Sequence, residues 1–119
     1  MPNTLKCRIE DTNNLELIVP SPGVSAGDMG LIEDTVYFWL EDYDTGALGV
    51  KIIEAKHCVL PATSASVFEV GDYVYYIAAT ANLTDTNTGT YRCGICRKAK
   101  AALELTVEVV FWGDKAVAT

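Results

Sequence analysis

The sequence predicts a single-domain, all-β protein built as a β-barrel or a β-sandwich. Aromatic and β-branched residues gather in short runs, and clusters of Gly, Asp, Asn and Pro separate these runs. No apolar pattern with the 3.6-residue period of a helix persists along the chain. The clearest stretch is 67–77, where the Gly71-Asp72 turn leads directly into Tyr73–Ile77. A chain of 119 residues suits one domain with its own core.

The first half of the chain predicts a series of short strands separated by turns. Pro20–Gly23 is a strong breaker cluster, and Gly27-Asp28 forms a second turn. Asp42–Gly46 reads as a hairpin loop whose glycine can take a positive φ. Gly49, inside a strand, indicates a bulge or a close backbone approach. The expected strands span residues 15–19, 29–32, 35–40, 47–53 and 58–60.

The second half predicts strands at 73–77, 91–99 and 103–112, with 82–84 beside a turn-rich loop. In the last of these strands the apolar side chains alternate with less apolar ones, which is typical of a strand with one buried face. Residues 98–105 also have the propensity for a single helical turn. The side chains expected on the buried face of the last strand are Leu105, Val107, Val109 and Phe111.

The two halves resemble each other. Gly27-Asp28 recurs as Gly71-Asp72, and the strand glycine Gly49 recurs as Gly94 at nearly the same offset. Each half therefore contains a Gly-Asp turn, an aromatic strand, a loop, and a strand with a central glycine. We treat an internal duplication as a hypothesis, in which two such halves pair their edges into a closed or nearly closed barrel.

The chain divides into a predicted N-terminal arm at 1–14, a β domain at 15–112 and a C-terminal tail at 113–119. The arm is rich in turn formers, and only Leu5, Cys7 and Ile9 alternate among them. These three side chains suit a short edge strand or a segment that lies extended along a partner. A frayed terminus explains them equally well.

Charge and hydropathy restrict the partners. The formal net charge is −7, from 16 acidic and 9 basic residues, so we expect no nucleic-acid binding. The longest apolar runs are too short to span a membrane. No basic segment precedes an apolar one at the N-terminus, which predicts synthesis without a secretory signal.

No motif for catalysis or for a cofactor stands out, so the sequence predicts a protein that is not an enzyme. There is no phosphate-binding loop and no nucleophile elbow, and His57 reads as a half-exposed strand residue. Acidic residues near 33–44 lack the spacing of a calcium loop, so we expect no metal site. Cys93 and Cys96 form a lone C-x-x-C whose members face opposite sides of a strand, and we expect reduced thiols. Thiol redox chemistry at this pair remains an alternative.

Two aromatic runs provide a second alternative, a binding module for glycans. Aromatic rings on a protein surface stack against sugars, but such runs more often form core and interface. The side chains in question are Tyr37, Phe38, Trp39, Tyr73, Tyr75 and Tyr76.

The order of these motifs resembles a known family. Val24–Asp28, Gly49-Val50, Val70–Tyr76 and Gly94-Ile95, followed by a final Val-rich strand, are similar to small tailed-phage and prophage proteins that decorate, or cement, the capsid. The family was long catalogued as a domain of unknown function. Some members have carried a recombinase label, which does not fit a chain without a phosphate-binding loop. The resemblance covers about residues 15–111.

The resemblance implies a structural role in the virion, without catalysis or cofactor. It implies a β protein on the outside of an icosahedral head, bound to the major capsid protein and associated as a homotrimer. It also implies synthesis in the cytoplasm of the host bacterium. On this interpretation Leu5, Cys7 and Ile9 are the candidate capsid contacts of the arm, and host glycan binding remains the alternative function.

Overall fold

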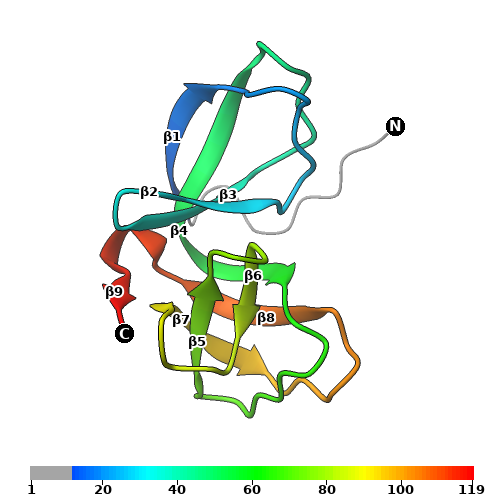
Figure 1. Cartoon of the computed structure of the whole chain (residues 1–119), viewed down its shortest axis with the longest axis vertical. Helices are drawn as coiled ribbons and strands as arrows, with labels where there is room; N and C mark the ends of the chain where they lie inside the picture. Colours follow the sequence, from blue (N-terminus) through cyan, green and yellow to red (C-terminus); the bar gives the residue numbers. More distant parts are fainter. Residues whose placement is uncertain (1–11) are drawn as a thin grey trace.

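The computed structural model describes residues 12–119, which form one antiparallel, nearly closed barrel-like sheet (Figure 1). Apart from one 3-10 turn, η2 (Gly113–Lys115), the regular structure of this part consists of strands. The all-β prediction is therefore confirmed. The strands are β1 (Thr12–Ile18), β2 (Met29–Ile32), β3 (Thr35–Trp39), β4 (Leu48–Pro61), β5 (Tyr73–Ile77), β6 (Asn82–Thr84), β7 (Tyr91–Lys98), β8 (Thr106–Phe111) and β9 (Val117–Ala118).

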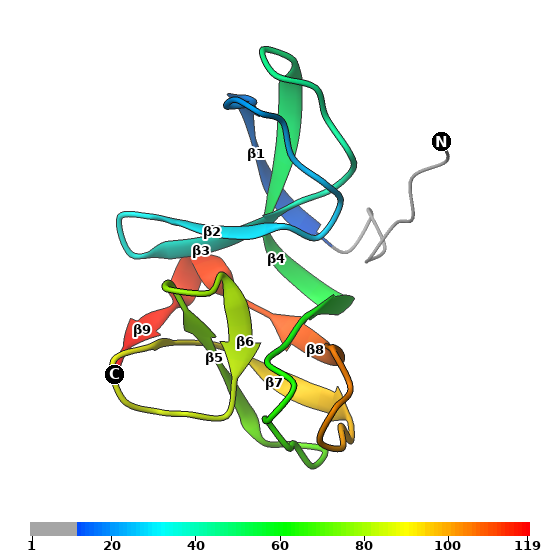
Figure 2. The same ribbon diagram turned by 45° about the vertical axis from the view of Figure 1, so that its right-hand side comes forward.

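The strands follow the order β2-β3-β4-β8-β7-β5-β6, with β1 paired to β4 and β9 paired to β7. A single bridge between Ala62 and Leu83 joins the end of β4 to β6, and the N–H of Thr63 donates to the Leu83 carbonyl at 2.9 Å. This contact joins β6, at one end of the sheet, to the end of β4. The second half of β4 therefore encloses a small barrel with β5, β6, β7 and β8 (Figures 1 and 2).

Strand β4 connects this barrel to the rest of the sheet. Ile52 is paired with both Asn14 and Phe38, so β1 and β3 lie on opposite edges of the first half of β4. Beyond Ala55 the strand pairs with β8 instead. The sequence predicted two strands here, 47–53 and 58–60, and this prediction was wrong. Residues 54–57 are weak strand formers, but pairing with β1 and then β8 keeps them extended.

Two other strands begin three residues away from their predicted start, while the remaining differences in strand bounds are single residues. Strand β1 begins at Thr12 rather than at Leu15, and pairing with β4 supplies the extra length. The last long strand begins at Thr106 rather than at Leu103, because Leu103 has a φ of 77°, which a strand does not accommodate. As a result Leu105 lies outside β8 and is exposed, although its alternation with Val107 predicted a buried position. Residues 98–105 form no helical turn.

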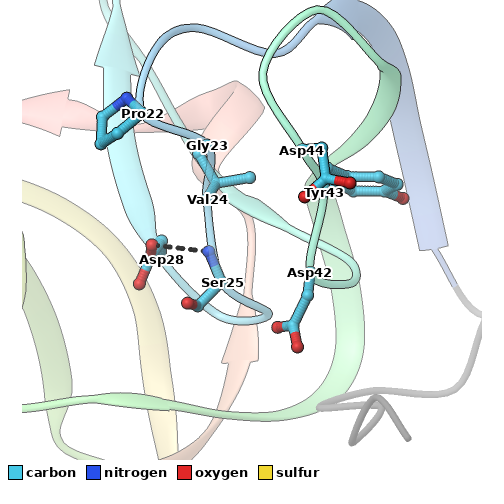
Figure 3. A pocket seen from close by; sticks show the side chains of 8 residues that line it. All are labelled: Pro22, Gly23, Val24, Ser25, Asp28, Asp42, Tyr43 and Asp44. Atoms are coloured by element: carbon cyan, nitrogen blue, oxygen red, sulfur yellow. Dashed lines mark hydrogen bonds between the residues drawn. The ribbon is translucent and has the colours of Figure 1, made fainter. Parts of the chain in front are cut away.

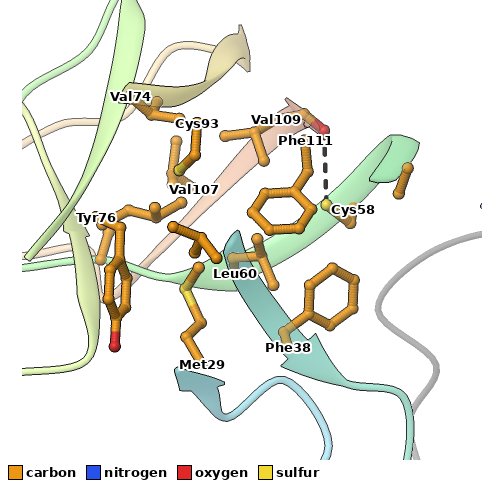
Figure 4. Packing of buried hydrophobic residues seen from close by; sticks show 14 of the residues in the cluster. Met29, Phe38, Cys58, Leu60, Val74, Tyr76, Cys93, Val107, Val109 and Phe111 are labelled. Carbon is orange, nitrogen blue, oxygen red and sulfur yellow. Dashed lines mark hydrogen bonds between the residues drawn. The ribbon is translucent and has the colours of Figure 1, made fainter. Parts of the chain in front are cut away.

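The core lies where the β2–β3 hairpin packs against the barrel (Figure 4). Phe38 of β3 contacts Phe111 of β8 edge to face, with ring centroids 5.3 Å apart. Met29 of β2 faces Leu60 in the same cluster. Side chains from both parts of the sheet therefore share one buried cluster, so the barrel and the hairpin are packed as a unit.

The C-terminal segment, which was predicted to be a tail, packs onto the barrel. The backbone of Gly113 in η2 lies directly against the carbonyl of Val36, where a Cβ atom would collide with it. Beyond η2, β9 pairs with β7 through Ala118 and Tyr91. The hydroxyl of Thr119 donates to the Thr90 carbonyl at 2.9 Å.

Candidate functional site

The two Gly-Asp turns have the same local geometry. Gly27 and Gly71 have φ values of 87° and 95°, which favour glycine. In each turn the aspartate backbone N–H donates to the carbonyl three residues earlier, at 3.0 Å from Ser25 for Asp28 and at 3.1 Å for Asp72. Each aspartate Oδ2 also accepts a 2.9 Å hydrogen bond from the N–H of that earlier residue. These residues fix how the chain enters β2 and β5.

In each half a hairpin follows the turn, β2–β3 in the first half and β5–β6 in the second, but the two hairpins occupy different places in the sheet. The N–H of Gly27 donates to the backbone carbonyl of Trp39 on β3 at 2.8 Å, whereas the N–H of Gly71 donates to the backbone carbonyl of Cys96 on β7 at 2.9 Å. In the first half the second strand of the hairpin, β3, pairs with the rest of the sheet through β4. In the second half it is the first strand of the hairpin, β5, that pairs with the rest of the sheet, through β7. The halves therefore share the turn but not the order of their strands.

The two strand glycines admit different neighbours. A Cβ on Gly49 would lie 2.7 Å from Cζ3 of Trp39 and 2.8 Å from Cγ2 of Val19, so the missing side chain leaves room for these two. A Cβ on Gly94 would instead collide with the carbonyl oxygen of Val110 on the adjacent strand. Both glycines allow close packing, Gly49 against side chains and Gly94 against backbone.

The predicted arm contacts Leu5, Cys7 and Ile9 lie outside the described residues. The strand that follows them, β1, ends in the exposed Ile18, which pairs with the exposed Leu48 of β4. The pair joins the end of β1 to the start of β4, and these two strand ends are drawn at the upper end of the molecule in Figure 1.

The two cysteines of the C-x-x-C are buried in the core, and neither is in a disulfide. Burial raises the pKa of both the Cys93 and the Cys96 thiols, and the Sγ of Cys96 donates to the Lys98 carbonyl at 3.0 Å. A buried thiol with a raised pKa is a poor nucleophile, because little thiolate forms near neutral pH. These environments favour a packing role for both side chains.

The aromatic side chains considered for glycan binding form no exposed platform. Phe38, Trp39 and Tyr76 are buried, and only Tyr73 among the six is classed as exposed. The Arg92 guanidinium lies over the Tyr73 ring, 4.7 Å from its centroid. Lys51 is likewise held over Tyr37, with Nζ 3.9 Å from the ring centroid. Most of these rings therefore pack within the protein.

An acidic hollow of about 390 Å³ lies between the loop 22–28 and the loop 42–44 (Figure 3). One of its carboxylates joins the two loops, because Oδ1 of Asp42 accepts a 2.8 Å hydrogen bond from the N–H of Ala26. Another holds the loop 22–28 in its turn, because Oδ2 of Asp28 accepts a 2.9 Å hydrogen bond from the N–H of Ser25. Among residues 12–119, no three His, Cys, Asp or Glu side chains lie close enough together to hold a metal ion. The hollow is therefore a space between two surface loops that a hydrogen bond holds together.

Exposed aliphatic side chains are the remaining candidates for a contact surface. Leu103 is the most exposed of them, at 83% of its full accessible area, and Leu105 follows it along the chain. Sequence reasoning missed both, because residues 103–112 were expected to form one strand with Leu105 facing inward. No helix in the described part of the chain is long and apolar enough to cross a membrane.

Comparison with known proteins identifies the family. The family model described as phage cement protein matches residues 9–111, which is most of the chain. Neither the curated proteins nor the solved structures contain a significant match. The match includes both Gly-Asp turns and strands β1 to β8, so it covers the whole barrel and the hairpin packed on it. The chain therefore belongs to the phage cement protein family, which implies association with a phage capsid.

Proposed function

We propose that this protein decorates the outside of a tailed-phage head, where it binds the major capsid protein, stabilises the shell and performs no catalysis. The family match carries this proposal. On this proposal the protein is made in the cytoplasm of the host bacterium and joins the virion when the head has assembled. The glycan-binding alternative has less support, because three of its six aromatic side chains are buried.

The fold suits this role. Most of the barrel strands are paired on both edges, and a shared core joins the barrel to the hairpin, which favours a stiff unit that transmits load between its contacts. Repeated copies on an icosahedral surface bind by avidity, because each additional link between neighbouring capsomers becomes intramolecular. A small β protein that binds through several modest contacts can therefore stabilise a large shell.

The arm and the oligomer complete the proposal. We propose that residues 1–14 are an arm, with Leu5, Cys7 and Ile9 as its capsid contacts, that 15–112 are the β domain and that 113–119 are its tail. We also propose a homotrimer, which matches the local three-fold positions of an icosahedral lattice. A segment that becomes ordered when it binds contributes contact area at an entropic cost.

Co-sedimentation with purified phage heads tests this function, together with the native mass of the free protein. We expect saturable binding to heads by the full chain and a native mass of three copies. A variant lacking residues 2–11 tests the arm without removing β1, which begins at Thr12. We expect this variant to keep the melting temperature of the full chain and to bind heads more weakly.

Each part of the proposal has its own contradicting outcome. A full chain that does not sediment with heads contradicts the cement function. Binding by the shortened variant that equals that of the full chain contradicts the arm contacts alone. A monomeric native mass contradicts the homotrimer and leaves the capsid-binding result unaffected.

A further inference from the structure

Two loops at one end of the barrel present a cluster of exposed aliphatic side chains. These loops, 62–72 and 99–105, lie side by side at the lower end in Figures 1 and 2. We define the aliphatic surface as Val67, Leu103 and Leu105, which are 51%, 83% and 66% exposed. Their exposure contrasts with the inward side chains of the same loops, since Phe68 and Lys100 are buried.

The loops are held together along their length. The N–H of Ala62 donates to the Leu105 carbonyl at 2.9 Å, and that of Leu103 donates to Ser64 at 2.6 Å. Further along, Phe68 and Lys100 form a two-way backbone bridge. This ladder places the backbone of Val67 beside the segment that carries the two leucines, so all three exposed residues lie on the same pair of loops.

A buried lysine braces the same loops from beneath. The Nζ of Lys100 donates to the carbonyl of Ser66 at 2.6 Å and to that of Ala101 at 3.1 Å. A charged side chain that is buried and hydrogen-bonded in this way holds its partners in place. The aliphatic surface is therefore presented on a fixed support, and binding through it orders little additional chain.

The backbone at Leu103 points to a role for its side chain. Leu103 has a φ of 77°, a conformation in which glycine or asparagine is ordinarily found. Its side chain is almost fully exposed, so burial in the core does not explain a leucine at this position. Backbone conformations of this kind cluster at functional sites, and Leu103 combines one with an exposed apolar side chain.

The charges around the surface indicate the partner. The exposed ionisable side chains of the two loops are acidic, namely Glu69, Asp72 and Glu104, and Lys100 between them is buried. Asp85 adds a fourth carboxylate, because its Oδ2 accepts a 3.1 Å hydrogen bond from the N–H of Val67. The exposed cations beside the loops are Arg97 and Lys98 of β7, and Nζ of Lys98 lies 3.6 Å from the Glu108 carboxylate, so the surroundings are acidic on balance. Two copies that met through this surface would bring their acidic residues together, which is unfavourable. A partner with an apolar patch bordered by basic side chains is complementary to it.

We propose that the aliphatic surface of Val67, Leu103 and Leu105 docks on an apolar patch, bordered by basic side chains, on the outer face of the major capsid protein. This inference rests on the proposed cement function and assigns it a contact within the described part of the chain. The aliphatic surface acts alongside the arm. Once one of these two contacts has formed, the other forms intramolecularly, so the overall affinity for the head exceeds that of either contact alone.

Matched asparagine substitutions test the proposal by co-sedimentation with phage heads. Leu103→Asn removes the apolar side chain and suits the positive φ, so we expect the melting temperature to be kept. We expect its affinity for heads to fall about tenfold, the loss that follows when an anchor side chain of an interface is removed. Leu48→Asn is the control, because Leu48 is an exposed leucine at the start of β4, and Figure 1 draws that end of β4 at the opposite end of the molecule from the two loops. We expect this variant to bind within about twofold of the unchanged chain. Glu69→Lys tests the charge argument, and we expect it to weaken binding.

The outcomes separate this inference from the cement function. If the unchanged chain binds heads and Leu103→Asn binds equally well, the docking surface is wrong and the cement function stands. A lower native mass for Leu103→Asn than for the unchanged chain identifies a second copy as the occupant and overturns the capsid assignment. Tighter binding by Glu69→Lys contradicts a basic partner. Failure of the unchanged chain to bind heads overturns both proposals.

Discussion

Close backbone approach at a single glycine decides how the C-terminal segment packs. Gly113 is buried, and the position of its missing side chain is occupied by the Val36 carbonyl and the ring of Phe111. The contact joins the segment after β8 to β3, which is distant in sequence. A methyl group at this position has no room unless η2 moves away from the sheet.

We therefore expect Gly113→Ala to reduce the free energy of unfolding by roughly 1–3 kcal/mol, the usual cost of overpacking. Urea unfolding measures this change. Gly89→Ala is the matched control, because Gly89 has a φ of 70° but no atom within 4 Å of the added Cβ. The control therefore reports backbone strain alone, at about 1 kcal/mol. A smaller loss for Gly113→Ala than for this control would show that η2 gives way without cost.

Sequence reasoning at the residue scale identified the turn glycines and the strand glycines Gly49 and Gly94, but not the packing role of Gly113. Gly27 and Gly71 stood out because a Gly-Asp pair before an aromatic run is a local signal. Gly113 and Leu103 carried no such signal. The contact of Gly113 with Val36 is long-range, and Leu103 takes its positive φ where its N–H donates to the carbonyl of Ser64 on another loop.

At the scale of elements, one carboxylate connects three neighbouring strands. Oε1 of Glu108 on β8 lies 2.9 Å from Nε2 of His57 on β4, and its Oε2 lies 3.6 Å from Nζ of Lys98 on β7. The hydrogen bond with His57, assisted by Lys98, lowers the pKa of the Glu108 carboxyl. A lowered pKa in the folded state means that this carboxylate stabilises the fold when it is ionised.

The contribution of Glu108 therefore depends on pH in a defined direction. It is fully present above the ordinary glutamate pKa of about 4.3 and is lost as the pH falls through the lowered folded value. We expect Glu108→Gln to lower the melting temperature near neutral pH by a small amount, equivalent to at most about 1 kcal/mol for a surface pair. The difference from the unchanged chain should disappear in acid. A difference that persists unchanged at low pH would contradict the ionic origin.

The limits of a strand were predicted correctly where a turn defines them, and incorrectly where only pairing with another strand defines them. Strands β2 and β5 have the expected limits, because a Gly-Asp turn begins each one. Strand β4 was divided in the prediction because residues 54–57 lack strand formers, and its continuity comes from β1 and β8. Strand β9 was not expected, since its two residues are held only by β7.

At the scale of the whole molecule, β4 makes the two parts of the sheet interdependent. Its first half holds β1 and the β2–β3 hairpin, and its second half closes the barrel with β8 and β6. The Phe38–Phe111 contact links the same two parts through the core. Neither part has a complete core of its own, because the buried cluster draws on both.

We therefore expect the chain to unfold in a single two-state transition, as small domains with one core do. The two tryptophans report on different places, since Trp39 is packed in the hairpin and Trp112 follows β8. Urea unfolding of Trp112→Phe, followed by fluorescence, isolates Trp39, and Trp39→Phe isolates Trp112. In each variant the fluorescence midpoint should coincide with the far-ultraviolet circular dichroism midpoint of the same variant. A fluorescence transition of Trp39 that precedes the circular dichroism transition would show that the hairpin melts from an intact barrel, and that β4 does not couple the two parts.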